Sequence, residues 1–554
     1  MLSWSRRASL PAPGRHRGRI PEWHTETRTD IRTVLQQAVG AGPPHAACWD
    51  EAGTGAGGAQ PPELSAMFRT PEAVVVSSPR KFFHIYPTRA DKKNKTGSSG
   101  VRLLILLASR ASQIEKELSQ GVRKPYKELI DVCWCDPHSV GVKPLTFVRQ
   151  VLAACVYPQL MKSHELPLDV RQRAQWLLGR CDGGSVGSYN AQPCIPEIIE
   201  KVSEFTTRRD GGVPSYPENI FISTGSQWDI LNVLVNSEAS PKTGVLTPAP
   251  CHVTSMMSIT ALGAAAVPYY LTEEQGWTLQ VEELQRALES AKGVCNPVAL
   301  YVINPGNPAG LVQSRKSMQE VIRFASEKRL FLLADEVYQD FVYGENREFV
   351  SYKRVLAEMG PPYSDTVELV SFHSTSKGFM GECGMRGGYV ELVNLDPAVQ
   401  KHIFKLISKS SCTPVLAQMA LDLMVNPPQP GDPSYPLYNQ TQHIKNMLAQ
   451  NVKTTHEVLN SLPGVISQPV EGGAFVFPRV FLPPKAIQKE EGMQPDTFYC
   501  VRLLEETGVL CCPGSEFEQK EGTYHIRYNL TYTSHCHIKI HLTTFHTKFM
   551  KDFS

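Results

Sequence analysis

The sequence predicts an α/β protein with two domains, a large one built on a mostly parallel sheet with helices on both faces and a smaller α/β one. Two observations favour this fold. Between about residues 175 and 425, apolar strand-like runs alternate with helical stretches, a pattern typical of parallel sheets. A proline-rich break at residues 426–431 then separates this large domain from a C-terminal part with its own helix and strands.

Residues 1–70 are expected to form a poorly ordered extension. The first 20 residues carry five arginines and no Asp or Glu, which is typical of a mitochondrial transit peptide, although Pro11 and Pro13 interrupt a helix. Mitochondrial import is our hypothesis, and a cytoplasmic protein with a disordered basic tail is the alternative. Residues 53–58 match the dinucleotide motif G-x-G-x-x-G, but no strand precedes them, so we predict no nucleotide site.

The smaller domain is predicted to combine residues 71–174 with residues 426–554. Ile114 and Leu118, followed by Gly121, indicate the core face and the end of a helix, so the ordered body is expected to begin near Ile114. Residues 439–462 predict a long helix. The alternating run 524–528 predicts a strand that directs His525 and Arg527 to the same face.

Polar residues follow two apolar runs of the large domain. Residues 299–303 lead into a turn that contains Asn307, and residues 331–334 lead into Asp335 and, three residues later, Tyr338. Open α/β sheets bind their ligands at the carboxyl ends of the strands. Asp335 is therefore a candidate for holding a pyridine nitrogen protonated, and Tyr338 for contacting a ring hydroxyl.

Lys377 stands among small hydroxylic and glycine residues in the segment 371–389. A lysine that forms a Schiff base needs an unobstructed approach, and the phosphate of an aldehyde cofactor needs a hydroxyl and a guanidinium, which Ser374 and Arg386 supply. A solvated lysine in a Ser/Gly-rich loop is the alternative. Residues 374–377 also spell the S-x-x-K of serine penicillin-recognising enzymes, but both K-T-G matches precede it and no S-D-N occurs.

Four motifs, in this order, resemble those of the aspartate-aminotransferase-like, fold-type I pyridoxal-phosphate enzymes, and within them those of the alanine aminotransferases. They are residues 304–310 (NPGNPAG), 333–340 (LADEVYQD), 371–389, and 513–515 with 521–527 (PGS and EGTYHIR). The resemblance covers about residues 110–530. It implies a two-stage transamination with pyridoxal 5'-phosphate, in which L-alanine gives pyruvate and 2-oxoglutarate gives L-glutamate.

The resemblance also implies individual roles. Lys377 would hold the cofactor covalently and transfer the substrate proton, Asp335 would pair with the pyridine nitrogen, and Arg527 would clamp the α-carboxylate through two parallel hydrogen bonds. Tyr189 matches a tyrosine that reaches the phosphate of a neighbouring subunit, which implies a homodimer. The other cofactor contacts would come from Gly225, Ser226, Gln227, His252, Asn307, Tyr338, Ser374 and Arg386, with Asn307 and Cys135 also at the substrate.

Several positions depart from the family's pattern. Cys135 and Glu516 stand where relatives have glycine, and larger side chains there are expected to narrow the site. His252 replaces the ring-stacking tyrosine, Cys194 replaces a further glycine, and Trp228 replaces a small acceptor after Ser226-Gln227. The alternative to an active enzyme is therefore a catalytically impaired relative that binds the cofactor without efficient turnover.

Composition favours small-molecule partners. The formal charge of +2 over 554 residues gives no basis for nucleic-acid binding, and the apolar run 103–107 is far too short to cross a bilayer. Amino acids and 2-oxo acids remain as the expected partners. The 14 cysteines are scattered and no secretory signal is visible, which indicates a reducing compartment and free thiols.

Two clusters of histidine and cysteine residues are candidates for metal sites. His535, His537 and His541 alternate with apolar residues, and we interpret them as an exposed strand or a poorly packed tail. Residues 133–138 contain two cysteines and a histidine but no fourth ligand nearby. No metal site is predicted at either place.

Overall fold

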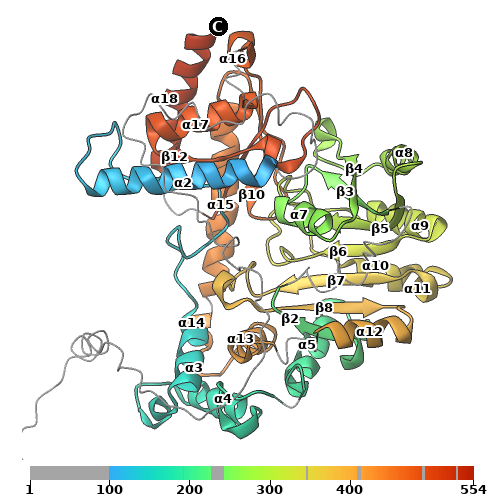
Figure 1. The fold of residues 1–554 in the computed structure, drawn as a ribbon. Coiled ribbons are helices and arrows are strands. Elements are labelled where there is room, and N and C mark those ends of the chain that lie inside the picture. Colours follow the sequence, from blue (N-terminus) through green and yellow to red (C-terminus); the bar gives the residue numbers. More distant parts are fainter. Residues whose placement is uncertain are drawn as a thin grey trace, which may run out of the picture. The chain divides into compact units, whose positions relative to one another are not determined.

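The computed structural model (Figure 1) describes residues 99–190, 192–225, 242–344, 347–407, 413–438, 440–488, 493–531 and 535–554. The extension expected over residues 1–70, with its basic start and its glycine motif, lies outside the described residues. No helix in the described part of the chain is long and apolar enough to span a membrane.

A seven-stranded sheet with the order β2-β8-β7-β6-β5-β3-β4 forms the centre of the large domain. Neighbouring strands from β7 to β4 run parallel, and β8 runs antiparallel to both of its neighbours. The prediction of a mostly parallel sheet is confirmed. The strands are β2 (Ile220–Ser223), β3 (Thr243–Ala249), β4 (Ala265–Tyr270), β5 (Asn296–Ile303), β6 (Phe331–Asp335), β7 (Leu369–Ser374) and β8 (Gly388–Val393).

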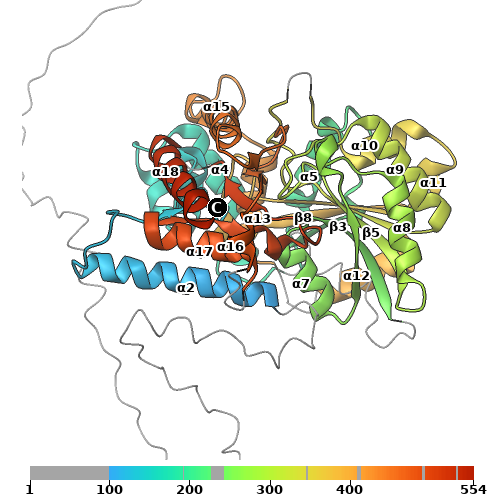
Figure 2. The ribbon, with the colours of Figure 1, turned by 90° about the horizontal axis from the view of Figure 1, so that it is seen from above.

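Helices cover both faces of this sheet because successive strand side chains point to opposite sides. Leu300 and Leu332 pack against α8, α9 and α10, whereas Tyr301 and Leu333, one residue further along, pack in a second core with α7 and α12 (Figure 2). The helices are α7 (Val253–Ala261), α8 (Val281–Ala291), α9 (Arg315–Lys328), α10 (Tyr352–Met359), α11 (Tyr363–Thr366) and α12 (Pro397–Ile407).

A group of helices packs beside β2 and β8 around α13 (Val415–Val425), whose residues are buried apart from Leu416. Its other members are α3 (Thr146–Val156), α4 (Leu168–Leu178) and α5 (Pro196–Arg209). Residues 146–178 thus share a core with helices of the large domain, whereas residues 130–132 share one with the C-terminal part. The domain boundary at residue 175 stays a prediction.

The C-terminal part contains long helices and small sheets. Its helices are α14 (Tyr435–Tyr438), α15 (Gln440–Asn460), α16 (Pro484–Gln488), α17 (Pro495–Thr507) and α18 (His535–Phe553). Its strands are β9 (Val465–Ile466), β10 (Phe475–Val476), β11 (Arg479–Val480), β12 (Val509–Leu510), β13 (Cys512–Pro513) and β14 (Ile526–Asn529), with β1 (Ile130–Asp131) pairing parallel to β12. The predicted helix over residues 439–462 and the strand containing Arg527 are confirmed.

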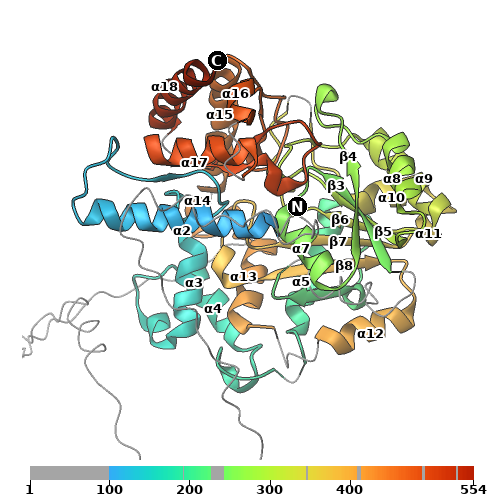
Figure 3. The same cartoon turned by 45° about the horizontal axis from the view of Figure 1, so that its top comes forward.

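Helix α2 (Ser99–Ser119) lies along α17 (Figure 3), and Arg110 Nη2 donates to Glu505 Oε2 at 3.0 Å. The helix ends just before Gly121, whose φ of 80° suits glycine, as the sequence predicts. It begins well before Ile114, where we expected order to start. Nothing in the local pattern marks that start, because the first turn contains no acidic residue.

The histidine-rich C-terminus is a helix, so the expectation of an exposed strand or tail was wrong. Leu542, Phe545 and Phe549 are buried at helical spacing and pack in the core of the C-terminal part. The alternation that favoured a strand covers only residues 535–542. The helical spacing of the buried residues becomes visible only when Leu542 is taken together with Phe545 and Phe549, which follow that run. No group of three or more His, Cys, Asp or Glu side chains in the described ranges is arranged to hold a metal ion.

Candidate active site

The ends of three neighbouring parallel strands bring the candidate residues together. Asp335 ends β6, Ser374 ends β7, and Asn307 follows β5 after a short turn. Because β5, β6 and β7 are adjacent and parallel, these ends meet at one edge of the sheet. Asp335 is buried, with Oδ2 accepting a hydrogen bond from Tyr301 Oη at 2.7 Å and Oδ1 one from the Val337 N–H at 3.3 Å.

Lys377 lies three residues beyond β7 and is half-buried. Its Nζ donates to the backbone carbonyl of Cys135 at 3.2 Å, so the loop after β1 lies directly against the lysine. Gly378 follows in a left-handed conformation with φ of 61°, and a Cβ there would stand 2.2 Å from Asp340 Oδ2. Only glycine fits this turn, which fixes the direction in which Lys377 points.

The phosphate-binding candidates lie at the β2 side of the same edge. Arg386 adopts a left-handed conformation, and its exposed guanidinium reaches back toward β2. A Cβ at Gly225 would be 2.8 Å from Arg386 Nη2, so glycine at this position permits the close approach. Ser226, Gln227 and Trp228 lie outside the described residues, and their predicted part in the phosphate site stays a prediction.

His252 and Tyr338 both lie close enough to Arg527 to feel its charge, and Tyr338 also feels that of Asp335. Burial, and after it the nearby charges of Arg527 and Lys377, lower the pKa of His252 to about 3, so its ring is neutral near pH 7. Tyr338 Oη is buried beside the Cys135 thiol, and no hydrogen bond of good geometry joins it to another of the described residues. Burial raises the pKa of Tyr338 well above its usual value, which keeps the hydroxyl a donor.

Arg527 is a buried cation on β14, with 4% of its surface exposed. Its Cζ lies 4.0 Å from the ring centroid of Phe475 and 4.5 Å from that of Phe517. Nη1 donates to Asn307 Oδ1 at 3.4 Å, Nη2 to the Cys133 carbonyl at 2.6 Å, and Nε has no partner among the described residues. Burial lowers the pKa of Arg527 to about 10.

No ion pair joins Arg527 to a carboxylate in the described ranges. The charge of Asp131 acts on it, but Asp131 Oδ1 accepts from the backbone N–H groups of Cys133 and Trp134. Leaving a buried guanidinium without a carboxylate is costly, and an incoming carboxylate removes that cost. The alternation over residues 524–528 also allows a face turned to solvent, with Arg527 in a weak surface ion pair. That alternative is wrong, because both His525 and Arg527 are buried.

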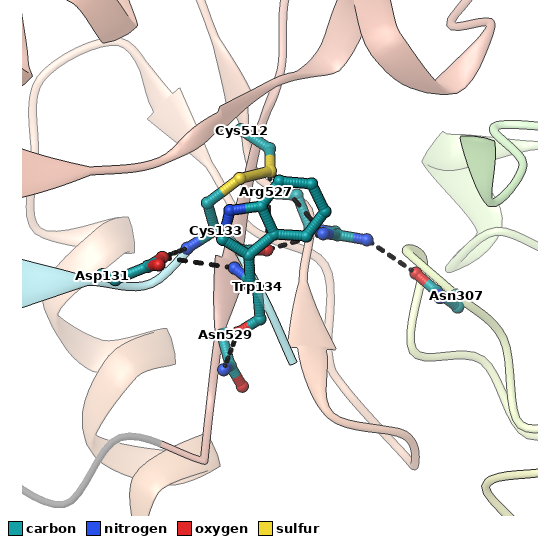
Figure 4. The surroundings of a disulfide bond; sticks show 7 residues. All are labelled: Asp131, Cys133, Trp134, Asn307, Cys512, Arg527 and Asn529. Atoms are coloured by element: carbon teal, nitrogen blue, oxygen red, sulfur yellow. Dashed lines mark hydrogen bonds between the residues drawn. A yellow bond between two sulfur atoms is a disulfide. The ribbon is translucent and has the colours of Figure 1, made fainter. Parts of the chain in front are cut away.

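A disulfide joins Cys133 to Cys512 directly above Arg527 (Figure 4). The expectation that all cysteines are free thiols was therefore wrong, although nine further cysteines are free. The two half-cystines are 379 residues apart, so no local pattern could have paired them. Because Cys133 is engaged in this bridge, it is not available as a zinc ligand.

The remaining departures from the family's pattern fall in different places. Cys135 is at the site, beside Lys377 and Tyr338, as expected. The buried carboxylate of Glu516 lies near Asp496 of α17, without a hydrogen-bond partner among the described residues, and its expected narrowing of the pocket stays a prediction. Cys194 is buried in the core around α13, and Tyr189 is 79% exposed.

Sequence reasoning missed three residues that shape the site. Tyr301 bonds to Asp335, and Phe475 and Phe517 enclose the Arg527 guanidinium. The position of Tyr301 within an apolar strand was the one available signal, since a buried tyrosine hydroxyl needs a partner. Nothing in the local sequence ties either phenylalanine to Arg527.

Comparisons with known proteins agree on one family. Residues 151–535 match the model of the family "Aminotransferase class I and II". The chain is 50% identical to alanine aminotransferase 1 of Homo sapiens over 430 residues, covering 76% of this chain and 87% of that protein. It is 48% identical to alanine aminotransferase 2 of Xenopus laevis over 453 residues, covering 80% and 84%.

Among solved structures, the fold is similar to that of an alanine aminotransferase from Pyrococcus furiosus, with a TM-score of 0.63 and 19% identity over 82% of this chain and 98% of that one. The polar groups of the site fit pyridoxal phosphate. Asp335 offers a buried carboxylate, Tyr338 a buried hydroxyl, and Arg386 a guanidinium beside Gly225. The chain is a pyridoxal-phosphate-dependent aminotransferase and belongs to the class I and II aminotransferase family.

Proposed function

We propose that the protein transfers the amino group of L-alanine to 2-oxoglutarate, giving pyruvate and L-glutamate in two half-reactions. The observation that carries the proposal is the buried Arg527, whose Nε lacks a partner and whose charge lacks a carboxylate among the described residues. Both half-reactions use an α-carboxylate, so one guanidinium serves both. Identities of 48–50% to alanine aminotransferases support the choice of amino acid.

When bound, pyridoxal phosphate supplies an aldehyde that accepts the amino group and a ring that accepts the electron pair of the broken Cα–H bond. Lys377 would hold the cofactor, and its Nζ, once free, would take the proton from the substrate Cα. Asp335, oriented by Tyr301, would keep the ring nitrogen protonated. Neutral His252 would pack on the ring, and Tyr338 and Asn307 would donate hydrogen bonds to its oxygen.

The impaired relative is not favoured by any observation. Lys377, Asp335 and Arg527 are all present, and the Glu516 carboxylate lies near Asp496. Of the expected obstructions in the described chain, Cys135 and His252 are at the site. Lys377 Nζ donates to the backbone carbonyl of Cys135, so this contact does not depend on the Cys135 side chain.

We also propose that the protein is a homodimer and is imported into mitochondria. The 79% exposure of Tyr189 supports the dimer, since a side chain that serves a neighbouring subunit has to project from its own. The five arginines in the first 20 residues support import. Light scattering of the purified protein and organelle fractionation test the two proposals separately.

Arg527→Lys tests the shared clamp. Lysine keeps the charge but cannot offer two parallel hydrogen bonds, so KM for L-alanine and for 2-oxoglutarate should both rise by about 100-fold, given about 1.5–3 kcal/mol for a hydrogen bond to a charged group. Steady-state kinetics of each substrate measure this. Arg502→Lys, which changes an arginine paired with Glu506 on α17, should leave both values unchanged.

If Arg527→Lys affects one half-reaction only, the shared clamp is wrong. Retained binding of the cofactor, measured by its absorbance in the purified variant, shows that the large domain is intact. Unchanged KM values in an active variant would remove Arg527 from substrate binding altogether.

A further inference from the structure

Both cysteines of the Cys133–Cys512 disulfide contact Arg527, the proposed clamp for the substrate carboxylate. Cys512 on β13 stands directly opposite Arg527 on β14 in the antiparallel register, and its Sγ lies 3.6 Å from Arg527 Nη2. Cys133 supplies the carbonyl that accepts from the same Nη2 at 2.6 Å. Figure 4 shows the bridge and the guanidinium side by side.

We propose that this disulfide positions Arg527, so that the oxidation state of the Cys133–Cys512 pair sets the affinity of the site for α-carboxylates. The proposal rests on the clamp role of Arg527 proposed above. Cys133 and Cys512 are positioning residues, because they act on the substrate only through the guanidinium.

The bridge is the covalent tie between the loop after β1 and the strand that faces Arg527. A dithiol reductant breaks the Sγ–Sγ bond, delivering two electrons and two protons to form two thiols while its own sulfurs become a disulfide. Two unbonded sulfur atoms cannot stay at bonding distance, so a cysteine side chain rotates or its segment shifts. Movement of Cys512 Sγ changes one contact of Arg527 Nη2, and a shift of the Cys133 backbone changes the other.

Other contacts keep the loop attached when the bridge is open. The Asn529 N–H donates to the Val132 carbonyl at 2.8 Å, and Asn529 Nδ2 donates to the Trp134 carbonyl at 2.6 Å (Figure 4). β1 also pairs with β12. Reduction is therefore expected to be a local change at Arg527 and not an unfolding of the C-terminal part.

The aromatic enclosure confines the effect further. Phe475 and Phe517 hold the guanidinium between their faces. Phe517 follows Cys512 by five residues and shares a core cluster with both half-cystines, whereas Phe475 on β10 packs in a different cluster. We therefore expect the contact with Phe475 to keep the cation in place while reduction alters where Nη2 points. Since Asp335, Lys377 and Ser374 belong to the strand ends of the large sheet, cofactor binding and the chemical step should change little.

The test compares the purified holoenzyme before and after treatment with dithiothreitol. Alkylation and peptide mapping establish whether Cys133 and Cys512 are bridged. KM is measured for L-alanine and 2-oxoglutarate, and calorimetry gives the Kd of 2-methylalanine, which carries an α-carboxylate but no α-hydrogen. We expect both KM values and this Kd to rise by about tenfold on reduction, with kcat changed less than twofold and full recovery on reoxidation.

Variants provide a second arm. Cys512→Ser should raise both KM values and make them insensitive to dithiothreitol. Cys155→Ala, which removes a buried free thiol of α3, should leave the response to dithiothreitol intact. If the Cys512→Ser protein does not fold, reduction of the unaltered enzyme decides.

Two outcomes overturn the proposal. In the first, peptide mapping finds both cysteines as thiols after reduction, but the KM values and the Kd are the same as before reduction. In the second, mapping of the untreated protein never finds Cys133 and Cys512 bridged. Both leave the proposed reaction standing. Absence of transamination by the oxidised holoenzyme counts instead against the proposed function.

Discussion

The two sides of the active site are held by different means. The sheet-edge group, Asn307, Asp335 and Lys377, follows adjacent strands of one sheet. The arginine group, Cys133, Cys512 and Arg527, is assembled from segments up to 394 residues apart, through a disulfide, a carbonyl and two aromatic faces. We infer from this difference that cofactor chemistry depends on residues positioned by the sheet, whereas substrate affinity depends on packing between distant segments. Each group should therefore fail in its own way.

The largest effect is expected from Lys377→Ala, which removes the reacting amine from the sheet-edge group. Turnover should fall by at least about 10⁴-fold, because general base catalysis alone contributes about 10²–10⁴-fold and the covalent attachment is lost as well. Borohydride reduction followed by intact mass measurement should find cofactor attached to the unaltered chain and none on the variant. Lys316→Ala, on the exposed side of α9, should behave like the unaltered chain.

Attachment of the cofactor to another lysine would falsify the assignment of Lys377. The arginine group should be unaffected by this change, so the variant is still expected to bind 2-methylalanine with an affinity that responds to dithiothreitol. Loss of that response in Lys377→Ala would mean that the two groups are not independent.

Asp335→Ala should have the next largest effect. Without the carboxylate the ring nitrogen loses its proton, so kcat should fall on the order of 10³-fold, the size of losing one preorganised charge contact. Tyr301→Phe deletes only the 2.7 Å hydrogen bond to Asp335 and should produce a smaller decrease in kcat. A near-normal kcat in Asp335→Ala would remove this residue from the mechanism.

Most of the sheet-edge group could be predicted from the sequence, for a physical reason. An apolar run followed by Asn-Pro-Gly or by carboxylates marks a buried strand and its end in a single stretch of chain, and parallel strand ends converge. Asp335, Asn307 and Lys377 are found at one edge as expected. Their roles at the cofactor stay predictions until variants are measured.

The arginine group could be predicted only in part. The alternation around Arg527 gave the strand and the shared face with His525, but burial of that face depends on the packing of residues that are remote in sequence. The disulfide, the stacking of Phe475 and Phe517, and the burial of Glu516 near Asp496 all arise from contacts between segments. None of them leaves a local pattern.

A smaller effect is expected from Cys135→Gly, at the boundary between the two groups. The thiol lies beside Tyr338 and near Arg527, so its removal should widen the substrate space and raise kcat/KM by a few-fold. The contact of the Cys135 carbonyl with Lys377 remains, since it involves the backbone. Cys135→Ser keeps the volume and should not raise kcat/KM; equal kinetics in all three proteins would mean that the pocket is not narrowed here.

The smallest change in activity is expected from Glu516→Gln. This variant should leave kcat and KM nearly unchanged and alter only the free energy of unfolding. Burial, followed by the charge of Asp496, raises the pKa of Glu516 from 4.5 to about 8 in the folded chain. Between these two pH values the folded state holds a proton that the unfolded state has released. The free energy of unfolding therefore falls as pH rises from about 4.5 to about 8, by a few kcal/mol from this group.

Glutamine cannot ionise, so the variant should lack this decline. Its Tm should match that of the unaltered chain near pH 4.5 and exceed it increasingly toward pH 8, as measured by calorimetry in steps of one pH unit. Glu521→Gln, an exposed change in the following turn, should preserve the decline. A constant Tm difference across this range would show that Glu516 is already ionised in the folded protein, with its charge stabilised by a partner. A change in kcat or KM that follows the change in Tm would place Glu516 at the substrate.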